Sequence, residues 1–429
     1  MNQELLKTIS RQKQKKDAFL FTNFVPRTQL DWKDELLKPN LIKIITGPRR
    51  AGKSIFLFLL LKGIDFMYAN FDDEELLKNI DNKDDFTDAL QKVYGPIKTI
   101  LFDEIQNLPT WDLYLNKLQR TGFNVYITGS NSNLLSTEFA SSLTGRYRSV
   151  EILPFSFKEY LKAKDIKKEE DLTIPFQNIL GRGGFPELVL STLDSEAYME
   201  NLISAVLYKD VTRRYKIREP KKIELMLSYL ISNTCNNLNY SKLTKICEMK
   251  DPRTTKKYIG YIEDSYLFYF LHGFSFKVAS YLSSSKKIYT VDNGILSYKN
   301  LFNSPSNGVF FENLVFTELV KKGFKPNANL FYYKTKTNNE VDFILKDIFH
   351  VFQIIQVCYD ISNKKTEERE IRSLLQASQE LKCDNLLVIT KDIDKAEKID
   401  GKVIDFISFA KWSLADNGIW DIIANNSKE

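Results

Sequence analysis

The chain has 429 residues, which is too long for one comfortable hydrophobic core, so we expect two or three domains. Its composition, 43% hydrophobic and 27% charged, is that of an ordinary soluble globular protein. The longest apolar run, residues 55–61, is far too short to cross a bilayer, and the polar N-terminus has no apolar signal core. These features predict a cytoplasmic protein without membrane association. The net charge of +6 permits nucleic-acid binding without requiring it.

Cysteine and histidine usage argues against a zinc ribbon or a disulfide framework. The chain has only two histidines, and its four cysteines lie far apart with no C-x-x-C pair, so buried structural thiols are expected. The N-terminus carries a basic run, which is either a solvated arm or an arm that contacts phosphates. The run consists of Lys7, Arg11, Lys13, Lys15 and Lys16.

The first half of the chain alternates strand patterns with helix patterns. This βα alternation predicts a parallel sheet covered by helices on both faces. The expected strands are residues 41–47, 64–71, 99–104, 124–130 and 147–154, and the expected helices include residues 53–63, 110–122 and 136–146.

The stretch KIITGPRRAGKS contains G-x-x-x-x-G-K-S between the first strand and the first helix. Glycine lets such a loop curl so that backbone N–H groups point at phosphate oxygens. Lys53 supplies a positive charge to the β- and γ-phosphates, and Ser54 supplies a hydroxyl to Mg²⁺. The predicted phosphate loop consists of Gly47, Pro48, Arg49, Arg50, Ala51 and Gly52.

Two acids in TILFDEIQ complete the predicted ATP site. Asp103 comes at the end of an apolar strand, where ligands of open α/β sheets collect, and suits the Mg²⁺ shell. Glu104 is placed to polarise a water for attack on the γ-phosphate, although it could also be a mere neighbour of a helix cap. We therefore predict hydrolysis of ATP to ADP and phosphate, and not binding alone.

Polar residues after the next strand have two interpretations. Thr128, Ser130 and Asn131 could hold the attacking water or sense the γ-phosphate, and they could equally cap the helix that follows. Arg146 comes after that helix and is either a finger to the phosphates of a neighbouring subunit or part of a surface salt bridge.

The motifs GPRRAGKS, LFDEIQ, TGSNSNLLS, LTGRY, LPFSFKEY and GGFPE follow one another as in predicted AAA+-type ATPases of bacteria and archaea. The chain resembles the archaeal-type branch, which is related to the STAND ATPases. The resemblance implies that the Gly-Gly-x-Pro segment, which ends at Pro186, packs near the adenine. A bare turn is the competing interpretation.

Helical periods replace the strand patterns from about residue 217. Three helical patterns, in residues 221–235, 239–249 and 250–271, suggest a helix-turn-helix, and the family resemblance makes it a winged helix. The third helix would present Arg253, Lys256 and Lys257 to duplex DNA. A winged helix that only packs between domains is the alternative.

The last third resembles a PD-(D/E)XK nuclease-like domain, in an α-β-β-β-α-β order. Such nucleases hold Mg²⁺ with carboxylates and use a lysine to orient or activate water. Glu312 and Asp342 fit the first two positions, but Gln356 replaces the second strand carboxylate and Cys358 replaces the lysine. Lys334 or Lys336 could reach the site from the neighbouring hairpin. Because an amide and a neutral thiol are poor substitutes, we predict a degenerate site without nuclease activity.

The sequence thus predicts an α/β protein with three domains. Residues 1–215 form a P-loop NTPase domain of the ASCE/AAA+ type with a lid, residues 216–300 form a largely α-helical winged helix, and residues 301–429 form the restriction-endonuclease-like domain. ATP and Mg²⁺ are the expected cofactors, and a homo-oligomer is expected. Two hypotheses remain for the purpose of the nucleotide cycle: binding or remodelling of duplex DNA, or a molecular switch in stress or defence signalling that acts on a protein partner.

Overall fold

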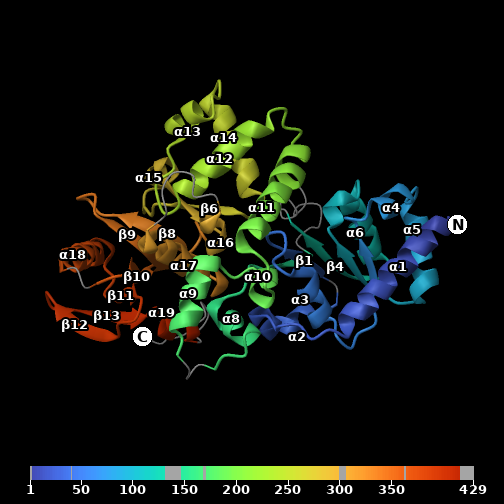
Figure 1. The fold of residues 1–429 in the computed structure, drawn as a ribbon, viewed down its shortest axis with the longest axis horizontal. Helices are drawn as coiled ribbons and strands as arrows, with labels where there is room; N and C mark the ends of the chain where they lie inside the picture. Colours follow the sequence, from blue (N-terminus) through green and yellow to red (C-terminus); the bar gives the residue numbers. More distant parts are fainter. Residues whose placement is uncertain are drawn as a thin grey trace. The chain divides into compact units, whose positions relative to one another are not determined.

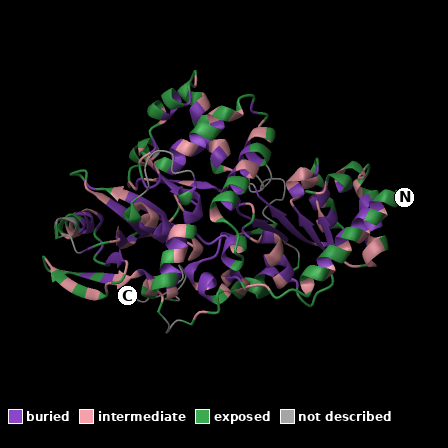
Figure 2. Cartoon of the chain, viewed as in Figure 1, coloured by how far each residue is buried: buried purple, intermediate pink, exposed green. Residues whose placement is uncertain are grey.

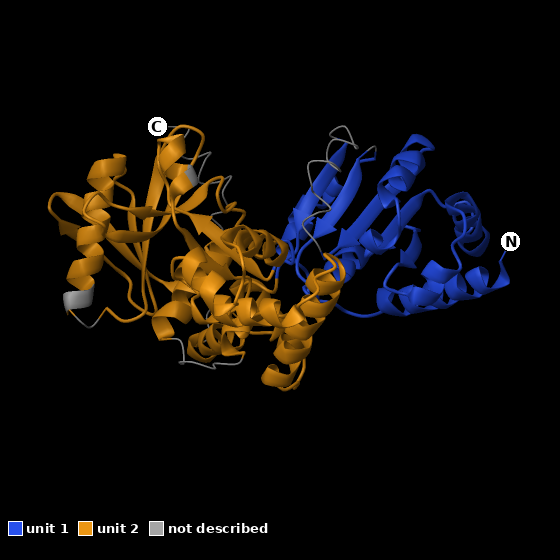
Figure 3. Ribbon diagram, turned by 90° about the horizontal axis from the view of Figure 1, so that it is seen from above, with its two compact units in different colours: residues 1–153, 264–266 blue, residues 154–263, 267–429 orange. Residues whose placement is uncertain are grey.

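The computed structural model describes residues 2–39, 41–130, 146–167, 171–298, 306–361 and 364–415. The chain divides into two compact units, which Figure 3 shows in different colours. The first unit comprises residues 1–153 and 264–266, and the second comprises residues 154–263 and 267–429.

A five-stranded parallel sheet forms the centre of the first unit, in the order β2-β3-β4-β1-β5. β4 therefore lies between β1 and β3, and the carboxyl ends of all three strands meet at one edge, where open α/β sheets bind ligands. This confirms the predicted α/β fold with a parallel P-loop NTPase sheet. The strands are β1 (Ile42–Thr46), β2 (Met67–Asn70), β3 (Thr99–Asp103), β4 (Asn124–Gly129) and β5 (Tyr147–Glu151).

Helices cover both faces of this sheet, so its central strands are buried (Figure 2). Ile42 and Ile44 of β1 pack in one core cluster with α1, α5 and α6, whereas Ile45 packs in the other cluster with α3. Successive side chains of β1 therefore point to opposite faces of the sheet and pack in both cores. The helices are α1 (Gln3–Leu20), α2 (Lys33–Leu36), α3 (Lys53–Leu60), α4 (Glu74–Lys78), α5 (Lys83–Tyr94) and α6 (Trp111–Arg120), with 3₁₀ turns η1 (Thr28–Trp32) and η2 (Ile105–Asn107). The predicted helix 136–146 falls almost entirely outside the described residues.

The basic N-terminal run is not a solvated arm but the helix α1, which lies beside α5 (Figure 1). Leu5 and Ile9 are one helical turn apart and both enter the core. Lys16 is buried, and its ammonium lies 4.9 Å from the ring centroid of Phe66. The apolar pair, Thr8, Gln12 and the aliphatic stem of Lys16 therefore give α1 a buried face, which a count of charges does not reveal.

The second unit begins with helices and a two-stranded antiparallel sheet of β6 and β7. Asn237 forms an isolated antiparallel bridge to Lys287 of β7, which adds a third short strand segment to this hairpin. The elements are α8 (Phe157–Ala163), α9 (Thr173–Arg182), α10 (Pro186–Leu190), α11 (Ser195–Ala205), the π-helical η4 (Val206–Arg213), α12 (Pro220–Ser232), α13 (Tyr240–Ile246), α14 (Pro252–Glu263), β6 (Phe268–His272), α15 (Val278–Ser283), β7 (Lys286–Thr290) and α16 (Asn293–Ser297).

A six-stranded mixed sheet forms the C-terminal part of the second unit, in the order β12-β13-β11-β10-β9-β8. β9 is antiparallel to β8 and β10, while β10, β11 and β13 are parallel. α17 and α18 both contact β10. The elements are α17 (Asn307–Lys321), β8 (Leu330–Lys334), β9 (Glu340–Lys346), β10 (Val351–Cys358), α18 (Lys364–Leu381), β11 (Leu386–Thr390), β12 (Lys395–Ile399), β13 (Lys402–Ser408) and α19 (Phe409–Leu414). All four cysteines are buried and free, as predicted.

Candidate functional site

The phosphate loop follows β1 and curls through three residues with positive φ. Gly47, Arg50 and Gly52 have φ angles of 131°, 62° and 92°. A Cβ on Gly47 would lie 2.1 Å from the carbonyl oxygen of Ile152, so this position requires glycine. Lys53, the first residue of α3, is 5% exposed, and its ammonium donates to the carbonyls of Gly47 at 3.1 Å and Pro48 at 2.9 Å.

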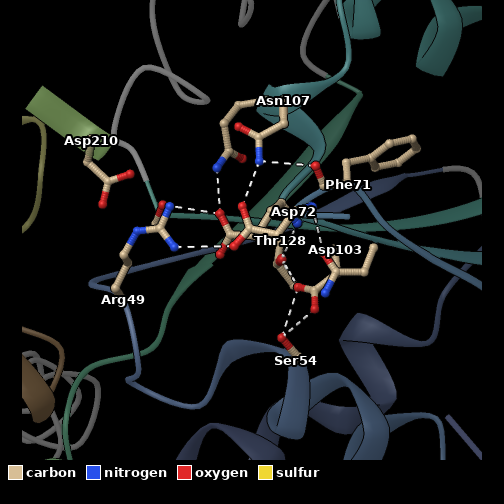
Figure 4. A network of polar contacts seen from close by, with 12 residues as sticks. Arg49, Ser54, Phe71, Asp72, Asp103, Asn107, Thr128 and Asp210 are labelled. Carbon is tan, nitrogen blue, oxygen red and sulfur yellow. Dashed lines mark hydrogen bonds and ion pairs between the residues drawn. The ribbon is translucent and has the colours of Figure 1, made fainter. Parts of the chain in front are cut away.

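Asp103 ends β3 and is surrounded by hydroxyl donors (Figure 4). The Ser54 hydroxyl lies 2.9 and 2.8 Å from its two carboxylate oxygens, and the Tyr68 hydroxyl donates at 3.2 Å. Thr128 at the end of β4 also donates to it. Burial and the adjacent Glu104 carboxylate raise the pKa of Asp103, although the hydrogen bonds from Thr128 and Ser54 and the charge of Lys53 oppose the shift.

Glu104 adopts a left-handed backbone conformation with φ 52°, directly after β3. Its Oε2 accepts hydrogen bonds from Gln106 Nε2 at 2.5 Å and Ser130 Oγ at 3.1 Å, and its Oε1 lies 3.8 Å from Lys53 Nζ. Burial alone would raise its pKa, but the positive charges of Lys53 and Arg49 and the two hydrogen bonds lower the pKa of Glu104. A buried carboxylate with a lowered pKa stays ionised and can accept a proton near neutral pH.

A second polar network fixes one side of the phosphate loop (Figure 4). Arg49 Nη1 lies 3.3 Å from Asp72 Oδ2, and Asn107 Nδ2 donates to Asp72 Oδ1 at 2.9 Å and to the carbonyl of Phe71 at 3.3 Å. Arg49 comes from the loop after β1, Asp72 from the turn after β2, and Asn107 from η2. Three segments that meet at the carboxyl edge of the sheet are thereby connected.

Several site residues were not found by sequence reasoning. Tyr68 and Gln106 contact the two acids directly, and Asp72 contacts the phosphate loop. Tyr68 reaches Asp103 because β2 pairs with β3, with Asn70 opposite Asp103. No local motif encodes that pairing, so strand order was the missing information.

The other predicted site residues lie in different places. Ala51 is buried in the loop, and its carbonyl accepts a hydrogen bond from Arg27 at 2.9 Å. Arg146 directly precedes β5, is exposed, and has its carbonyl bonded to the amide of Ile42 at 3.0 Å. Asn131 lies outside the described residues. Pro186 is the first residue of α10, in the second unit.

The glycines before Pro186 belong to a buried polar node of the second unit. The amide of Gly184 donates to Asp292 Oδ2 at 2.7 Å, and its carbonyl accepts from the amide of Phe155 at 2.7 Å. A Cβ on Gly183 would lie 1.7 Å from Asp292 Oδ1, and one on Gly184 would lie 2.4 Å from the Phe155 carbonyl oxygen. Close packing therefore accounts for both glycines, and an adenine contact of this segment stays a prediction.

Comparison with known proteins places this site in a family. The model of a family described as an AAA domain matches residues 39–161, and two described as domains of unknown function, DUF8612 and DUF4143, match residues 175–306 and 307–412. The uncharacterized protein MJ1544 of Methanocaldococcus jannaschii is 37% identical over 404 residues, which cover 88% of this chain and 89% of that protein. The chain belongs to the MJ1544 family.

Two further proteins show similarity to this member of the MJ1544 family. An uncharacterized protein of Haemophilus influenzae is 29% identical over 394 residues, covering 87% of the chain and 94% of that protein. The Walker-type ATPase PABY2304 of Pyrococcus abyssi is similar with a TM-score of 0.41 and 14% identity, covering 65% of the chain and 99% of that structure. With the AAA-domain match, the phosphate loop and the strand order, the first unit of this MJ1544-family chain is a P-loop domain of the AAA type.

The predicted DNA-contacting residues of α14 share an exposed surface. Arg253, Lys256 and Lys257 are all exposed, whereas Thr255 and Ile259 of the same helix are buried. The helix begins at Pro252. The geometry thus leaves three positive charges on the first turns of α14 facing away from the core.

Two of the predicted nuclease positions of this MJ1544-family chain, Asp342 of β9 and Gln356 of β10, lie on neighbouring strands of the C-terminal sheet and contact each other. Gln356 accepts from the amide of Asp342 at 3.3 Å and donates to Glu370. Cys358 is buried, and its thiol donates to the Asp360 carbonyl at 3.4 Å. The Glu312 carboxylate contacts a lysine that sequence reasoning missed, Lys287.

The hairpin lysines considered from the sequence lie beside other carboxylates than Glu312 and Asp342. The ammonium of the half-exposed Lys334 lies 3.9 Å from Glu340, and the backbone amide of Lys336 bonds to Glu380. Within the described residues, no group of three or more His, Cys, Asp and Glu side chains is arranged to hold a metal ion. In the same part of the chain, no helix is long and apolar enough to span a membrane.

Proposed function

We propose that the chain binds ATP with Mg²⁺ and hydrolyses it at the carboxyl edge of the parallel sheet. The observation that carries this proposal is the contact of Ser54 with Asp103 at 2.8–2.9 Å, directly beside the curled phosphate loop. Such a hydroxyl and carboxylate share a Mg²⁺ ion in P-loop enzymes. Their closeness would let the Ser54 hydroxyl oxygen and the Asp103 carboxylate hold one cation together.

The side chains fit the implied ligands. Hard oxygen donors suit Mg²⁺, which Ser54 and Asp103 would hold and which supplies positive charge at the phosphates when bound. The ammonium of Lys53 donates to the loop carbonyls of Gly47 and Pro48. With ATP bound, it would turn to the β- and γ-phosphates. The backbone N–H groups of the loop and the N-terminus of α3 add further donors for anionic oxygens.

Glu104 is the proposed general base. Its carboxylate is ionised at neutral pH and lies 3.8 Å from Lys53, so a water bonded to it would be next to the γ-phosphate. Gln106 and Ser130 bond to the same oxygen, Oε2, and thereby orient the carboxylate. The proton that leaves the attacking water would be accepted by Glu104.

Nucleotide binding tests the first half of this proposal. Replacing Lys53 by Ala removes the ammonium from the phosphates, so binding of a fluorescent ATP analogue, measured by titration, should be abolished. Lys62→Ala, an exposed lysine beyond the end of α3, is the control and should bind normally. Normal binding by Lys53→Ala would contradict the assignment of the phosphate loop.

Coupling of the nucleotide cycle to duplex DNA is the second candidate function. The order α12, Asn237 bridge, α13, α14, β6 and β7 is that of a winged helix, which supports the domain prediction for residues 216–300. The exposed charges of Arg253, Lys256 and Lys257 are suited to phosphate contacts. A nucleotide-controlled switch that acts on a protein partner is the alternative, and it predicts turnover indifferent to DNA.

The C-terminal sheet supports a role without DNA cleavage. Gln356 and Cys358 bring neither a carboxylate nor an ammonium to the positions that a nuclease needs, and Gln356 is already engaged by Glu370. We therefore propose that residues 301–429 form a degenerate nuclease-like domain.

The exposed Arg146 could reach a second ATP site only in a homo-oligomer, where it would be a finger to the phosphates of a neighbouring subunit.

A further inference from the structure

A buried lysine lies among the carboxylates of the C-terminal site. Lys287 is the second residue of β7, and only 1% of its side chain is exposed. Its ammonium lies 2.7 Å from Glu312 Oε1, 2.9 Å from Glu340 Oε1 and 3.6 Å from Asp342 Oδ1. Glu312 and Asp342 are the carboxylates that the nuclease resemblance assigns to Mg²⁺.

The backbone and the surrounding rings fix this ammonium in place. Lys287 pairs with Leu271 of β6 on one side and forms the bridge with Asn237 on the other. Its Nζ lies 5.9 Å from the ring centroids of both Tyr289 and Tyr332. The lysine therefore enters the carboxylate group from a strand that lies outside the six-stranded sheet.

The ammonium remains charged in this position. Three carboxylates, those of Glu312, Glu340 and Asp342, lie within 3.6 Å of its Nζ, and their negative charges favour the ammonium over the neutral amine. The Tyr289 hydroxyl donates to Glu312 Oε1 at 2.7 Å, so the same oxygen accepts from two groups. A buried ion pair of this kind requires close polar contacts to offset desolvation, and the ammonium has two within 3 Å, to Glu312 and Glu340.

The donor set does not fit a Mg²⁺ ion while Lys287 is present. Mg²⁺ requires oxygen ligands at about 2.0–2.1 Å, whereas an ammonium needs about 2.7–2.9 Å to carboxylate oxygens. A cation between Glu312 and Glu340 would therefore have to displace Lys287, which is tethered and so has a high effective concentration. Gln356, which replaces the other nuclease carboxylate, is neutral and adds no charge to favour a divalent ion.

We propose that Lys287 is the resident cation of the C-terminal carboxylate site: its ammonium takes the place of the metal ion, excludes divalent cations and joins β7 to the nuclease-like sheet. The chain itself thus supplies a positive charge beside Glu312, Glu340 and Asp342, where a nuclease would hold a metal ion. This inference is independent of ATP hydrolysis, because its residues and those of the phosphate loop belong to different units.

Binding of Mn²⁺ to the full chain without nucleotide tests the proposal. The concentration of free Mn²⁺ is followed by electron paramagnetic resonance, and the phosphate loop is unchanged in every variant. Lys287→Ala should bind one more Mn²⁺ per chain than the wild type. The affinity of the variant for Mn²⁺ at this site should be at least tenfold higher than that of the wild type. That additional ion should be absent in Lys287→Ala/Asp342→Asn.

Two controls separate this from general charge effects. Lys334→Ala removes one positive charge near the same Glu340, but from a side chain that is 43% exposed, and should add no Mn²⁺. Near-ultraviolet circular dichroism establishes that Lys287→Ala is folded, and a folded variant that binds no additional Mn²⁺ would overturn the proposal. If Lys287→Ala does not fold, the number of Mn²⁺ ions bound per chain is compared between the wild type and Asp342→Asn. Equal Mn²⁺ stoichiometry supports the proposal, and binding of one Mn²⁺ fewer by Asp342→Asn overturns it.

Discussion

Asp103 receives its position from hydroxyl groups of three different strands or helices. Ser54, Tyr68 and Thr128 all donate to its carboxylate, and they come from α3, β2 and β4. A carboxylate that accepts several hydrogen bonds keeps one orientation, which the proposed role of Asp103 as a metal ligand requires. The orientation of Asp103 thus depends on the three hydroxyl groups that donate to it.

Tyr68→Phe removes one of these donors without changing the volume of the side chain appreciably. We expect the Mg²⁺ concentration for half-maximal ATP turnover to rise about fivefold, which corresponds to the roughly 1 kcal/mol of one hydrogen bond. Tyr94→Phe is the control, because its hydroxyl bonds to the Tyr68 carbonyl and does not contact Asp103. An unchanged Mg²⁺ dependence in Tyr68→Phe would show that the hydroxyl plays no part in metal binding.

Asp292 makes stability depend on pH. Burial raises its pKa from 3.8 to about 6, despite hydrogen bonds from the amides of Gly184 and Gly294. A raised pKa means that the folded state binds the proton more tightly, so the stabilising contribution is full below pH 4 and disappears as pH rises through 6. The free energy of unfolding should fall by up to about 3 kcal/mol from this group over that window.

Asp292→Asn should remove this dependence, since the amide does not titrate. Urea unfolding at pH 4, 5, 6 and 7 gives the difference in unfolding free energy between wild type and variant. We expect the unfolding free energy of the wild type to fall relative to that of Asp292→Asn as pH rises from 4 to 7. A difference that stays constant from pH 4 to 7 would mean that Asp292 does not titrate there.

At the scale of elements, tight backbone contacts connect segments far apart in the sequence. Gly184, just before α10, is bonded to Phe155 before α8 and to Asp292 before α16. The conformations of three helix starts are therefore coupled at one buried point. A side chain at Gly184 has no space there.

Gly184→Ala should lower the free energy of unfolding by about 1–3 kcal/mol, because its Cβ would lie 2.4 Å from a backbone oxygen that cannot move freely. Gly181→Ala is a matched control inside α9, where a Cβ meets nothing within 4 Å, and should stabilise by up to about 1 kcal/mol. Thermal unfolding of both variants checks the pair. Equal effects of the two substitutions would refute the packing explanation for the glycine pair.

Local patterns predict elements well where periodicity is strong. The parallel strands, the phosphate loop and the helix after it could be predicted, because each is encoded by adjacent residues such as Gly52, Lys53 and Ser54. α1 could not, since its two core residues, Leu5 and Ile9, are outnumbered by charged neighbours. Tyr68 and Lys287 reach their acids only through strand pairing, which has no local pattern.

At the scale of the whole molecule, one unit provides the nucleotide site and the other provides the candidate partner surfaces. The α14 residues Arg253, Lys256 and Lys257 lie in the second unit. If the nucleotide cycle acts on DNA, binding at α14 must alter turnover at the phosphate loop. Comparison of turnover with and without DNA measures this coupling directly.

The triple substitution of Arg253, Lys256 and Lys257 by Ala should reduce DNA-stimulated ATP turnover to the level without DNA. It should also make the negative slope of log affinity against log salt shallower, by about 0.9 for each phosphate that the variant no longer neutralises. A control triple of the exposed Lys382, Lys398 and Lys411 changes the net charge equally and should leave stimulation unchanged. Wild-type turnover that DNA does not alter would favour the protein-partner switch.

Glu104 is the proposed base for hydrolysis of ATP, and single-turnover kinetics of wild type and Glu104→Gln measure its contribution. The amide keeps the size and the hydrogen-bonding positions of the side chain but cannot accept the proton of the attacking water. We predict that Glu104→Gln binds Mg²⁺-ATP as tightly as the wild type and hydrolyses it at least a hundredfold more slowly. Normal hydrolysis by Glu104→Gln would rule out Glu104 as the base, and no hydrolysis by the wild type would rule out the ATPase activity.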